Sequence, residues 1–311
     1  MSQWKLGKAT FSRTIAAALF TLLGTSLLIA GKPAPVPAPY TFTDLGGFGG
    51  FTSVQSEARA VSNVDDDDLL TVVGYSFTST PHESEPAAWT VTDAGTVVSV
   101  ANLGAPPAAS YTWAFSVNDH GVSVGSVVAG PPFVGFVCVR GVGTFPLPTF
   151  GGLGSSGNGI NNSGAIAGYA DDSDATRWGA LWHVDGQGNI TNPINLGTFL
   201  PSDINDFGEM AGSQGGVAAI AWFVDVEGTP TLQTQSLGVL SPGHRGSYAS
   251  AINNLREVVG TSNAPGSDAV SVSPQAFIWR AGTMTPLGNL GGGSSSAKSI
   301  KMGAGFKNAS A

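Results

Sequence analysis

Two short acidic stretches are the part of this sequence whose residue types come closest to forming a metal site. One is Asp65, Asp66, Asp67 and Asp68, and the other is Asp171, Asp172 and Asp174. Calcium takes about six to eight oxygen ligands, which carboxylates and carbonyls of one flexible loop can supply. Neither stretch matches the spaced aspartate loop of an EF-hand, and adjacent aspartates repel one another into solvent. We therefore expect solvated acidic loops, with calcium as the alternative and no other cofactor.

The histidines and the glycine-rich motif do not assemble into a catalytic centre. The four histidines are scattered and none has metal-ligand spacing: His82, His120, His183 and His244. The segment from Gly152 to Gly157 matches G-x-G-x-x-G, but a turn and a strand are expected after it. It therefore lacks the helix N-terminus that binds a phosphate. No G-x-S-x-G motif occurs, and the sequence predicts no catalytic residue.

The chain is acidic and poor in charged residues, with a formal net charge of −8 at pH 7 and 11% Asp, Glu, Lys and Arg. A phosphate-binding surface needs the opposite sign, so nucleic acid is not expected as a partner. An ordinary domain has about 25% charged residues, and here Gly, Ser, Thr and Asn replace them. That replacement favours short strands and turns over helices. The one cysteine, Cys138, lies in an apolar run and is expected to be buried.

The N-terminus has the layout of a secretory signal peptide. Lys5, Lys8 and Arg13 are followed by an uncharged apolar stretch over residues 14–30 and then by small residues. We predict a signal peptide over residues 1–31 and a Pro/Ala-rich linker over residues 32–39. The alternative is an uncleaved membrane anchor, for which this stretch is at the short limit. The expected location is extracellular or at the cell surface.

Five stretches repeat one pattern, in which an apolar residue precedes Asn, a turn, and an apolar strand that ends in Gly. The asparagines are Asn63, Asn118, Asn161, Asn205 and Asn253. The glycines are Gly74, Gly125, Gly168, Gly212 and Gly260. In turns such as NDHG and NNSG the Asn side chain can bond to nearby backbone, and the final Gly can adopt positive φ. Each stretch therefore predicts a β-hairpin.

A second hairpin is expected in each unit. Its first strand carries Trp89, Trp182, Trp222 or Trp279, and Cys138 takes this place in the second unit. Its second strand ends in Leu-Gly in most units. Recurrence in phase predicts that these tryptophans are core residues, with sugar-stacking platforms as the alternative. Trp113 is out of phase with them and is expected to be more exposed.

Two hairpins per unit of roughly 45 residues predict an all-β fold, a β-propeller-like array of about five four-stranded blades plus a partial sixth. The repeat domain spans residues 40–300, and its units lie near residues 44–104, 105–152, 153–199, 200–246 and 247–293. Residues 294–300 begin a sixth unit in phase, and residues 301–311 form an atypical tail. Residues 40–46 read as the last strand of a unit. We expect an incompletely closed ring with exposed edges in a shortened or frame-shifted chain.

These units resemble the HAF repeat of bacterial extracellular proteins. The best matches are DLGGFGGFTSVQSEARAV, SYASAINNLREVVG, QAFIW and PLGNLGGGSSSAKSI, and the resemblance covers nearly all of residues 40–293. The chain departs from the pattern at Gln275, before the Ala-Phe pair, and in its second unit, which lacks the Trp. The resemblance implies an exported propeller-like protein and transfers no catalytic residue.

The expected function is a non-catalytic interaction or structural module, because no unit is chemically distinctive. The expected partner is an extracellular protein or a glycan, with no membrane contact unless the signal segment is retained. The alternative is a secreted carbohydrate-active hydrolase or lyase, whose paired carboxylates would come from different units. Carboxylates with His or Tyr at the mouth of a central channel would favour the enzyme, and a channel lined by Gly, Ser and apolar residues would favour the module.

Overall fold

The computed structural model describes residues 43–48, 56–63, 68–78, 83–104, 111–127, 133–263 and 274–300. All of them belong to one compact unit that begins at Thr43. The predicted signal peptide, the linker, the tail and three of the four aspartates in the first acidic stretch lie outside the described residues. The described residues form twenty strands and no helix. They therefore contain no helix that is long and apolar enough to cross a membrane.

The strands form five four-stranded antiparallel sheets, here called blades 1 to 5. Blade 1 contains β1 (Ser56–Val61), β2 (Leu69–Phe77), β3 (Ser84–Thr92) and β4 (Val97–Asn102). Blade 2 contains β5 (Thr112–Val117), β6 (Ser123–Val127), β7 (Gly135–Val139) and β8 (Gly143–Pro146). Blade 3 contains β9 (Gly151–Ile160), β10 (Ala165–Asp172), β11 (Arg177–His183) and β12 (Ile194–Asn195). Blade 4 contains β13 (Leu200–Ile204), β14 (Met210–Gln214), β15 (Val217–Val226) and β16 (Thr229–Gly238). Blade 5 contains β17 (Gly246–Ile252), β18 (Val258–Asn263), β19 (Pro274–Arg280) and β20 (Thr283–Pro286).

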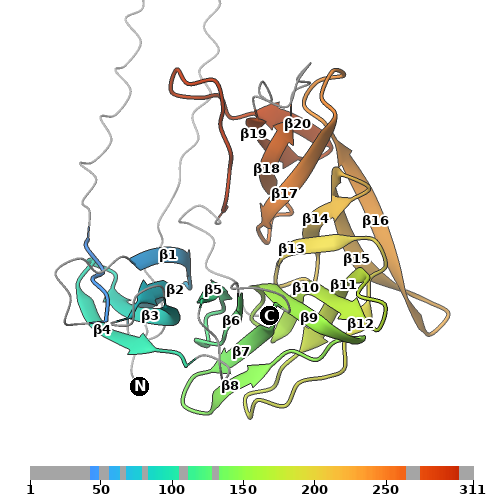
Figure 1. The fold of residues 1–311 in the computed structure, drawn as a ribbon. Helices are drawn as coiled ribbons and strands as arrows, with labels where there is room; N and C mark the ends of the chain where they lie inside the picture. Colours follow the sequence, from blue (N-terminus) through green and yellow to red (C-terminus); the bar gives the residue numbers. More distant parts are fainter. Residues whose placement is uncertain are drawn as a thin grey trace, which may run out of the picture. The chain divides into compact units, whose positions relative to one another are not determined.

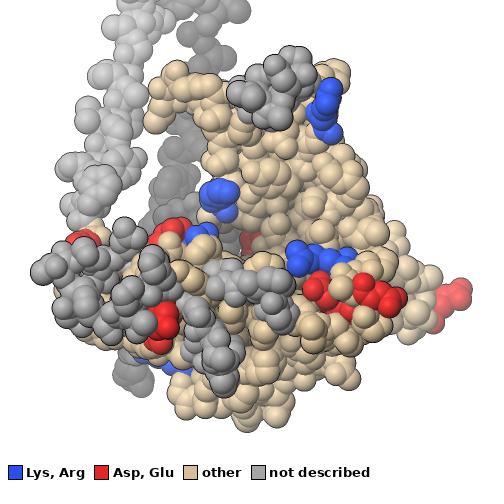
Figure 2. All heavy atoms as spheres, viewed as in Figure 1, with Lys and Arg blue, Asp and Glu red and all other residues tan. Residues whose placement is uncertain are grey.

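The five blades follow one another around a ring, as in a β-propeller (Figure 1). Strands within a blade are paired in chain order, so each blade is two consecutive hairpins, as the sequence predicts. From blade 2 onwards, the first strand of each blade lies against the second and third strands of the blade before it. Charged side chains form only small groups on the face shown in Figure 2, as expected for a chain with 11% charged residues.

The repeated glycines are required by a β-bulge in the first strand of every blade. Opposite Gly168 the ladder skips one residue of β9, and the same shift occurs opposite the other four glycines. A Cβ added at Gly168 would overlap the backbone carbonyl oxygen of Ser156. An added Cβ at the other four meets the equivalent carbonyl oxygen: Gly74 meets Glu57, Gly125 meets Trp113, Gly212 meets Leu200 and Gly260 meets Tyr248. Only glycine lets the bulged strand approach this closely.

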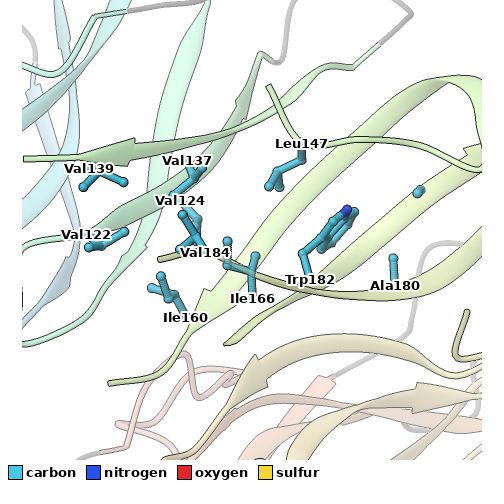
Figure 3. Close-up of a cluster of buried hydrophobic side chains, with 11 residues drawn as sticks. Val122, Val124, Val137, Val139, Leu147, Ile160, Ile166, Ala180, Trp182 and Val184 are labelled. Carbon is cyan, nitrogen blue, oxygen red and sulfur yellow. The ribbon is translucent and has the colours of Figure 1, made fainter. Parts of the chain in front are cut away.

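The hydrophobic core lies between neighbouring blades. Figure 3 shows the cluster between blades 2 and 3, where Val124 and Val137 face Ile166 and Trp182. Leu147, just after the last strand of blade 2, packs into the same cluster. Each of blades 1 to 4 thus covers the next blade with the apolar residues of its middle strands and with one terminal leucine. A single blade cannot bury both of its faces, so stacking in a ring provides the burial that stabilises the fold.

The predicted tryptophan position is correct in three blades and differs in blade 4. Trp89, Trp182 and Trp279 are buried, and each pairs with the residue two positions before the repeated glycine, namely Val72, Ile166 and Val258. In blade 4 that register position holds Ala221, which pairs with Met210. Trp222 stands one residue later and is half-buried. Successive strand residues point to opposite faces, so this one-residue difference moves the indole to the other side of the sheet.

Candidate functional site

A cavity of about 550 Å³ lies at the centre of the ring and is lined by the first strands of all five blades. The extra residue at each bulge contributes to its wall: Arg59, Phe115, Asn158, Ser202 and Ser250. A bulge interrupts the regular alternation of a strand and re-aims the side chain at that point. The bulge therefore places one side chain from each blade into the central channel.

Residues 298–300 add a sixth side to this cavity. Lys298 lines it together with Ser299 and Ile300, and Lys298 stands in the sequence repeat where Ser250 stands in blade 5. The six positions present two cations, one aromatic ring, one amide and two hydroxyl groups. This set can donate hydrogen bonds to a polar ligand and can also pack against its apolar surface.

Arg59 is held by neighbours on blades 1 and 2. Its Nε lies 2.8 Å from Glu57 Oε1. Its guanidinium lies 4.8 Å from the centre of the Trp113 ring, and that ring stacks on Tyr75 with centroids 4.9 Å apart. Trp113 Nε1 donates to Ser84 Oγ at 3.1 Å. Trp113 was expected to be more exposed than the recurring tryptophans. It is half-buried in this cluster, where its ring contacts the arginine beside the channel.

Asp203 is the one carboxylate among the described residues that line the cavity. Burial raises its pKa to about 6, although backbone N–H groups of Ile252 and Ile204 oppose that shift. The N–H of Ile252 donates to Asp203 Oδ2 at 3.0 Å and thereby links blade 4 to blade 5. A carboxyl group with a raised pKa inside a cavity is a feature of functional sites.

The predicted asparagines form a chain of hydrogen bonds at one mouth of the channel. Asn118, Asn161 and Asn205 each donate from Nδ2 to the backbone carbonyl oxygen of the next asparagine, at 3.1, 2.9 and 3.1 Å. The Oδ1 of Asn161 accepts from the N–H groups of Ser163 and Ala165 in its own turn. One buried side chain therefore closes a hairpin and joins two blades.

Asn63 does not occupy this position, contrary to the predicted alignment. Ser62 does: it is buried, and its Oγ accepts from the N–H of Thr71, as Asn118 Oδ1 accepts from that of Val122. Asn63 is exposed and belongs to the next position, where its N–H donates to Asp119 Oδ1 at 2.7 Å. The aspartates inserted after it in the sequence obscure this one-residue offset.

A second ring of alternating Asn and Asp side chains surrounds the same mouth. Its members are Asn63, Asp119, Asn162, Asp206 and Asn254. Asp119 and Asp206 are bridged by Asn162 Nδ2, at 2.8 and 3.3 Å, and Asp206 Oδ2 also accepts from Asn254 at 2.7 Å. Both oxygens of each carboxylate accept protein donors. These carboxylates therefore fasten blades together.

The second acidic stretch forms a tight turn between β10 and β11. Asp172 Oδ1 accepts from the N–H groups of Asp174 and Thr176, and its Oδ2 accepts from Trp178 Nε1 at 2.7 Å. These bonds, led by the one from Trp178, lower the pKa of Asp172. Asp171 pairs with Arg177 at 3.4 Å. Both carboxylates have partners within the protein, and Asp174 is exposed.

No group of three or more His, Cys, Asp and Glu side chains in the described part of the chain could hold a metal ion. Asp68 is described, whereas the rest of its acidic run lies outside, so calcium there stays a prediction. The three described histidines lie apart from the cavity lining: His120, His183 and His244. Cys138 is buried, as predicted, and burial raises the pKa of its thiol. The G-x-G-x-x-G segment lies within β9 rather than in a junction between units, and a turn and β10 follow it, as expected.

The bulge residues were not singled out from the sequence. The signal that could have found them is the variable position two residues before the apolar residue that precedes the buried Asn, or Ser62 in the first unit. That position is polar, aromatic or charged, whereas its neighbours are small or apolar except for Asp203. Comparison of the chain with models of known protein families finds no match, and comparison with curated proteins finds none either.

Proposed function

We propose that this chain is an exported, non-catalytic interaction module of the HAF-repeat type, which binds its ligand through the central channel of the propeller. The observation that carries the proposal is the channel lining. Each blade contributes one bulge side chain to a cavity of about 550 Å³, within the range of about 300–1,000 Å³ that small-molecule ligands occupy. The side chains differ between blades, whereas the backbone that presents them repeats.

The chemistry of the lining favours binding over catalysis. The described residues around the cavity include one carboxylate and no His or Tyr. The carboxylates at the mouth are fully hydrogen-bonded to neighbouring blades. Arg59, Asn158 and the serine hydroxyls supply hydrogen-bond donors, and Phe115 supplies a ring face. This combination suits a segment of glycan or a short segment of an extracellular protein.

A binding screen tests the proposal. The full chain is applied to glycan arrays and to extracellular proteins, with and without calcium, and hits are measured by calorimetry. Ser250→Trp, which fills the channel, is expected to abolish binding, and Ser241→Trp on an exposed turn serves as the matched control. Binding without turnover supports the module. Hits that bind the Ser250→Trp variant equally well would refute the channel as their site.

The alternative function is a carbohydrate-active enzyme, and the observation in its favour is Asp203. A carboxyl group with a pKa of about 6 can act as a general acid near neutral pH. A glycosidase needs a second carboxylate nearby, which the described cavity wall does not provide. Product release from any glycan hit, lost in Asp203→Asn, would establish the enzyme and reverse the assignment.

A further inference from the structure

Residues 295–300 lie against blade 5 in the way that the first strand of one blade lies against the blade before it. The N–H of Ser295 donates to Pro274 O at 2.8 Å, and Ser295 Oγ accepts from the N–H of Ala276 at 3.0 Å. Ser247 makes the same pair of bonds to blade 4, at 3.1 and 2.9 Å. Ser295 therefore marks the first strand of a sixth blade, although no described residue pairs with it as a ladder.

Residues 43–48 lie against blade 1 in the way that the end of one blade lies against the next. Ser56 Oγ donates to Gly46 O at 2.9 Å, as Ser247 Oγ donates to Gly238 O at 2.6 Å. Leu45 and Phe48 pack on the cluster around Trp89. The two ends of a sixth blade are thus present on the two sides of the interval between blade 5 and blade 1.

The surfaces that face this interval are exposed, whereas their equivalents elsewhere are buried. Val61 on β1 is 38% exposed, whereas Val117 and Ile252, at the same register position, are 8% and 5% exposed. Leu287 after β20 is 53% exposed, whereas its equivalent Leu196 is 3% exposed. In the complete interfaces, the middle strands of a blade cover these positions. Among the described residues, no middle strands of a sixth blade cover these two surfaces.

The buried indole of Trp89 lacks a hydrogen bond that its equivalent in blade 3 makes to the preceding blade. Its Nε1 has no hydrogen-bond partner among the described residues, although the side chain is fully buried. In blade 3, Trp182 Nε1 donates to Pro148 O at 3.0 Å, at the end of the preceding blade. Buried polar groups are normally hydrogen-bonded, so blade 1 has an unused donor at the face that would meet a sixth blade.

We propose that the interval between blade 5 and blade 1, here called the sixth-blade slot, binds a two-stranded β-hairpin donated by a second polypeptide of the same repeat type. The hairpin pairs with residues 295–300 by strand addition and covers Val61 and Leu287 with its apolar side chains. This inference rests on the proposed interaction role and names its partner. The donated hairpin would have the features of the middle hairpins that already pack between blades. These are a Gly-containing apolar strand, a turn, and a second strand that carries a bulky residue.

The test uses the chain's own middle hairpin as the probe. A fluorescent peptide with the sequence of residues 164–184, which covers β10 and β11, is titrated with the full chain and followed by anisotropy. We expect saturable one-to-one binding. Val61→Asp and Leu287→Asp, on opposite sides of the slot, are each expected to weaken binding at least about tenfold, because they place a charge in an apolar interface. Leu153→Asp, an exposed leucine on β9, is the matched control.

Val61 also lines the channel cavity, so Leu287→Asp and Ser250→Trp are the two variants that separate the slot from the channel. Absence of peptide binding, or equal binding by both slot variants and the control, overturns the slot while leaving a glycan or protein ligand of the channel untouched. Ser250→Trp is expected to leave peptide binding unchanged. Sedimentation of the chain alone completes the test. Self-association that the peptide does not displace, or that persists in Val61→Asp, would show that copies of the chain associate elsewhere and would contradict the slot.

Discussion

Asn161 Nδ2 donates to the backbone carbonyl oxygen of Asn205 at 2.9 Å, so a single buried side chain joins blade 3 to blade 4. The same relationship links blades 2 and 3 and blades 4 and 5. Neighbouring blades are thus held by apolar packing and by a polar fastener at the channel mouth. In a low-dielectric interface, removal of the donor or the acceptor of such a hydrogen bond destabilises the protein, because the remaining polar group stays buried without a partner.

Replacement of Asn161 by Asp is expected to destabilise the protein by about 1–3 kcal/mol. The Asp keeps the oxygen that accepts from the turn N–H groups but loses the donor to Asn205, and it brings a negative charge beside a carbonyl oxygen. Urea unfolding measures the change. Asn289→Asp is the control, because Asn289 is exposed and its Oδ1 also accepts from a backbone N–H, that of Gly291. Equal effects of the two substitutions would show that the bond between blades contributes nothing.

Replacement of Gly168 by Ala is expected to cost more than about 3 kcal/mol or to prevent folding, because the added methyl group would overlap the carbonyl oxygen of Ser156. Gly186→Ala is the matched control. It is also in blade 3, and no atom lies within 4 Å of its added Cβ. Thermal unfolding of both variants checks the prediction. A Gly168→Ala variant as stable as Gly186→Ala would refute the bulge geometry.

Trp182 and Trp222 are expected to respond differently to truncation. Trp182 is 1% exposed within the cluster between blades, so Trp182→Ala is expected to cost about 3–5 kcal/mol. Trp222 is half-buried on the opposite face, where the Arg256 guanidinium lies 4.5 Å from its ring centre, so Trp222→Ala is expected to cost about 1–2 kcal/mol. Denaturant unfolding of both variants measures the difference. Equal losses of stability would contradict the one-residue offset and support the sequence alignment in which Trp222 occupies the same position as Trp182.

Asp203 is expected to make stability depend on pH. Its folded pKa of about 6 lies above the value of about 3.9 for an unfolded chain, so the folded protein binds the proton more tightly. The ionised carboxylate therefore destabilises the fold fully above pH 6, and this effect disappears as the pH falls to about 4. Relative to Asp203→Asn, the wild-type protein should gain stability on the order of 1–3 kcal/mol between pH 7.5 and pH 4. A constant difference over this range would contradict the raised pKa.

Much of the blade structure could be predicted from residue types alone. The intervals between the asparagines and glycines predict the hairpins, and all five sheets fall in the predicted units to within about two residues. Gly168 illustrates the limit: the repeat indicates that glycine matters there, but not that a bulge is the reason. The offset at Ser62 and Asn63 was missed because both residues can cap a turn. The offset at Trp222 was missed because Ala-Ile-Ala-Trp aligns equally well with its neighbours.

The sequence by itself determined the number and order of the strands, because turn residues and apolar alternation act over a few neighbouring positions. Only the tertiary structure decided the register of each strand and therefore which side chains meet. A bulge shifts the alternation by one residue, so Arg59, Asn158 and Ser250 enter one cavity although roughly a hundred residues separate consecutive members of this set. Contacts at that separation depend on how five sheets pack in a ring, and no local pattern encodes them.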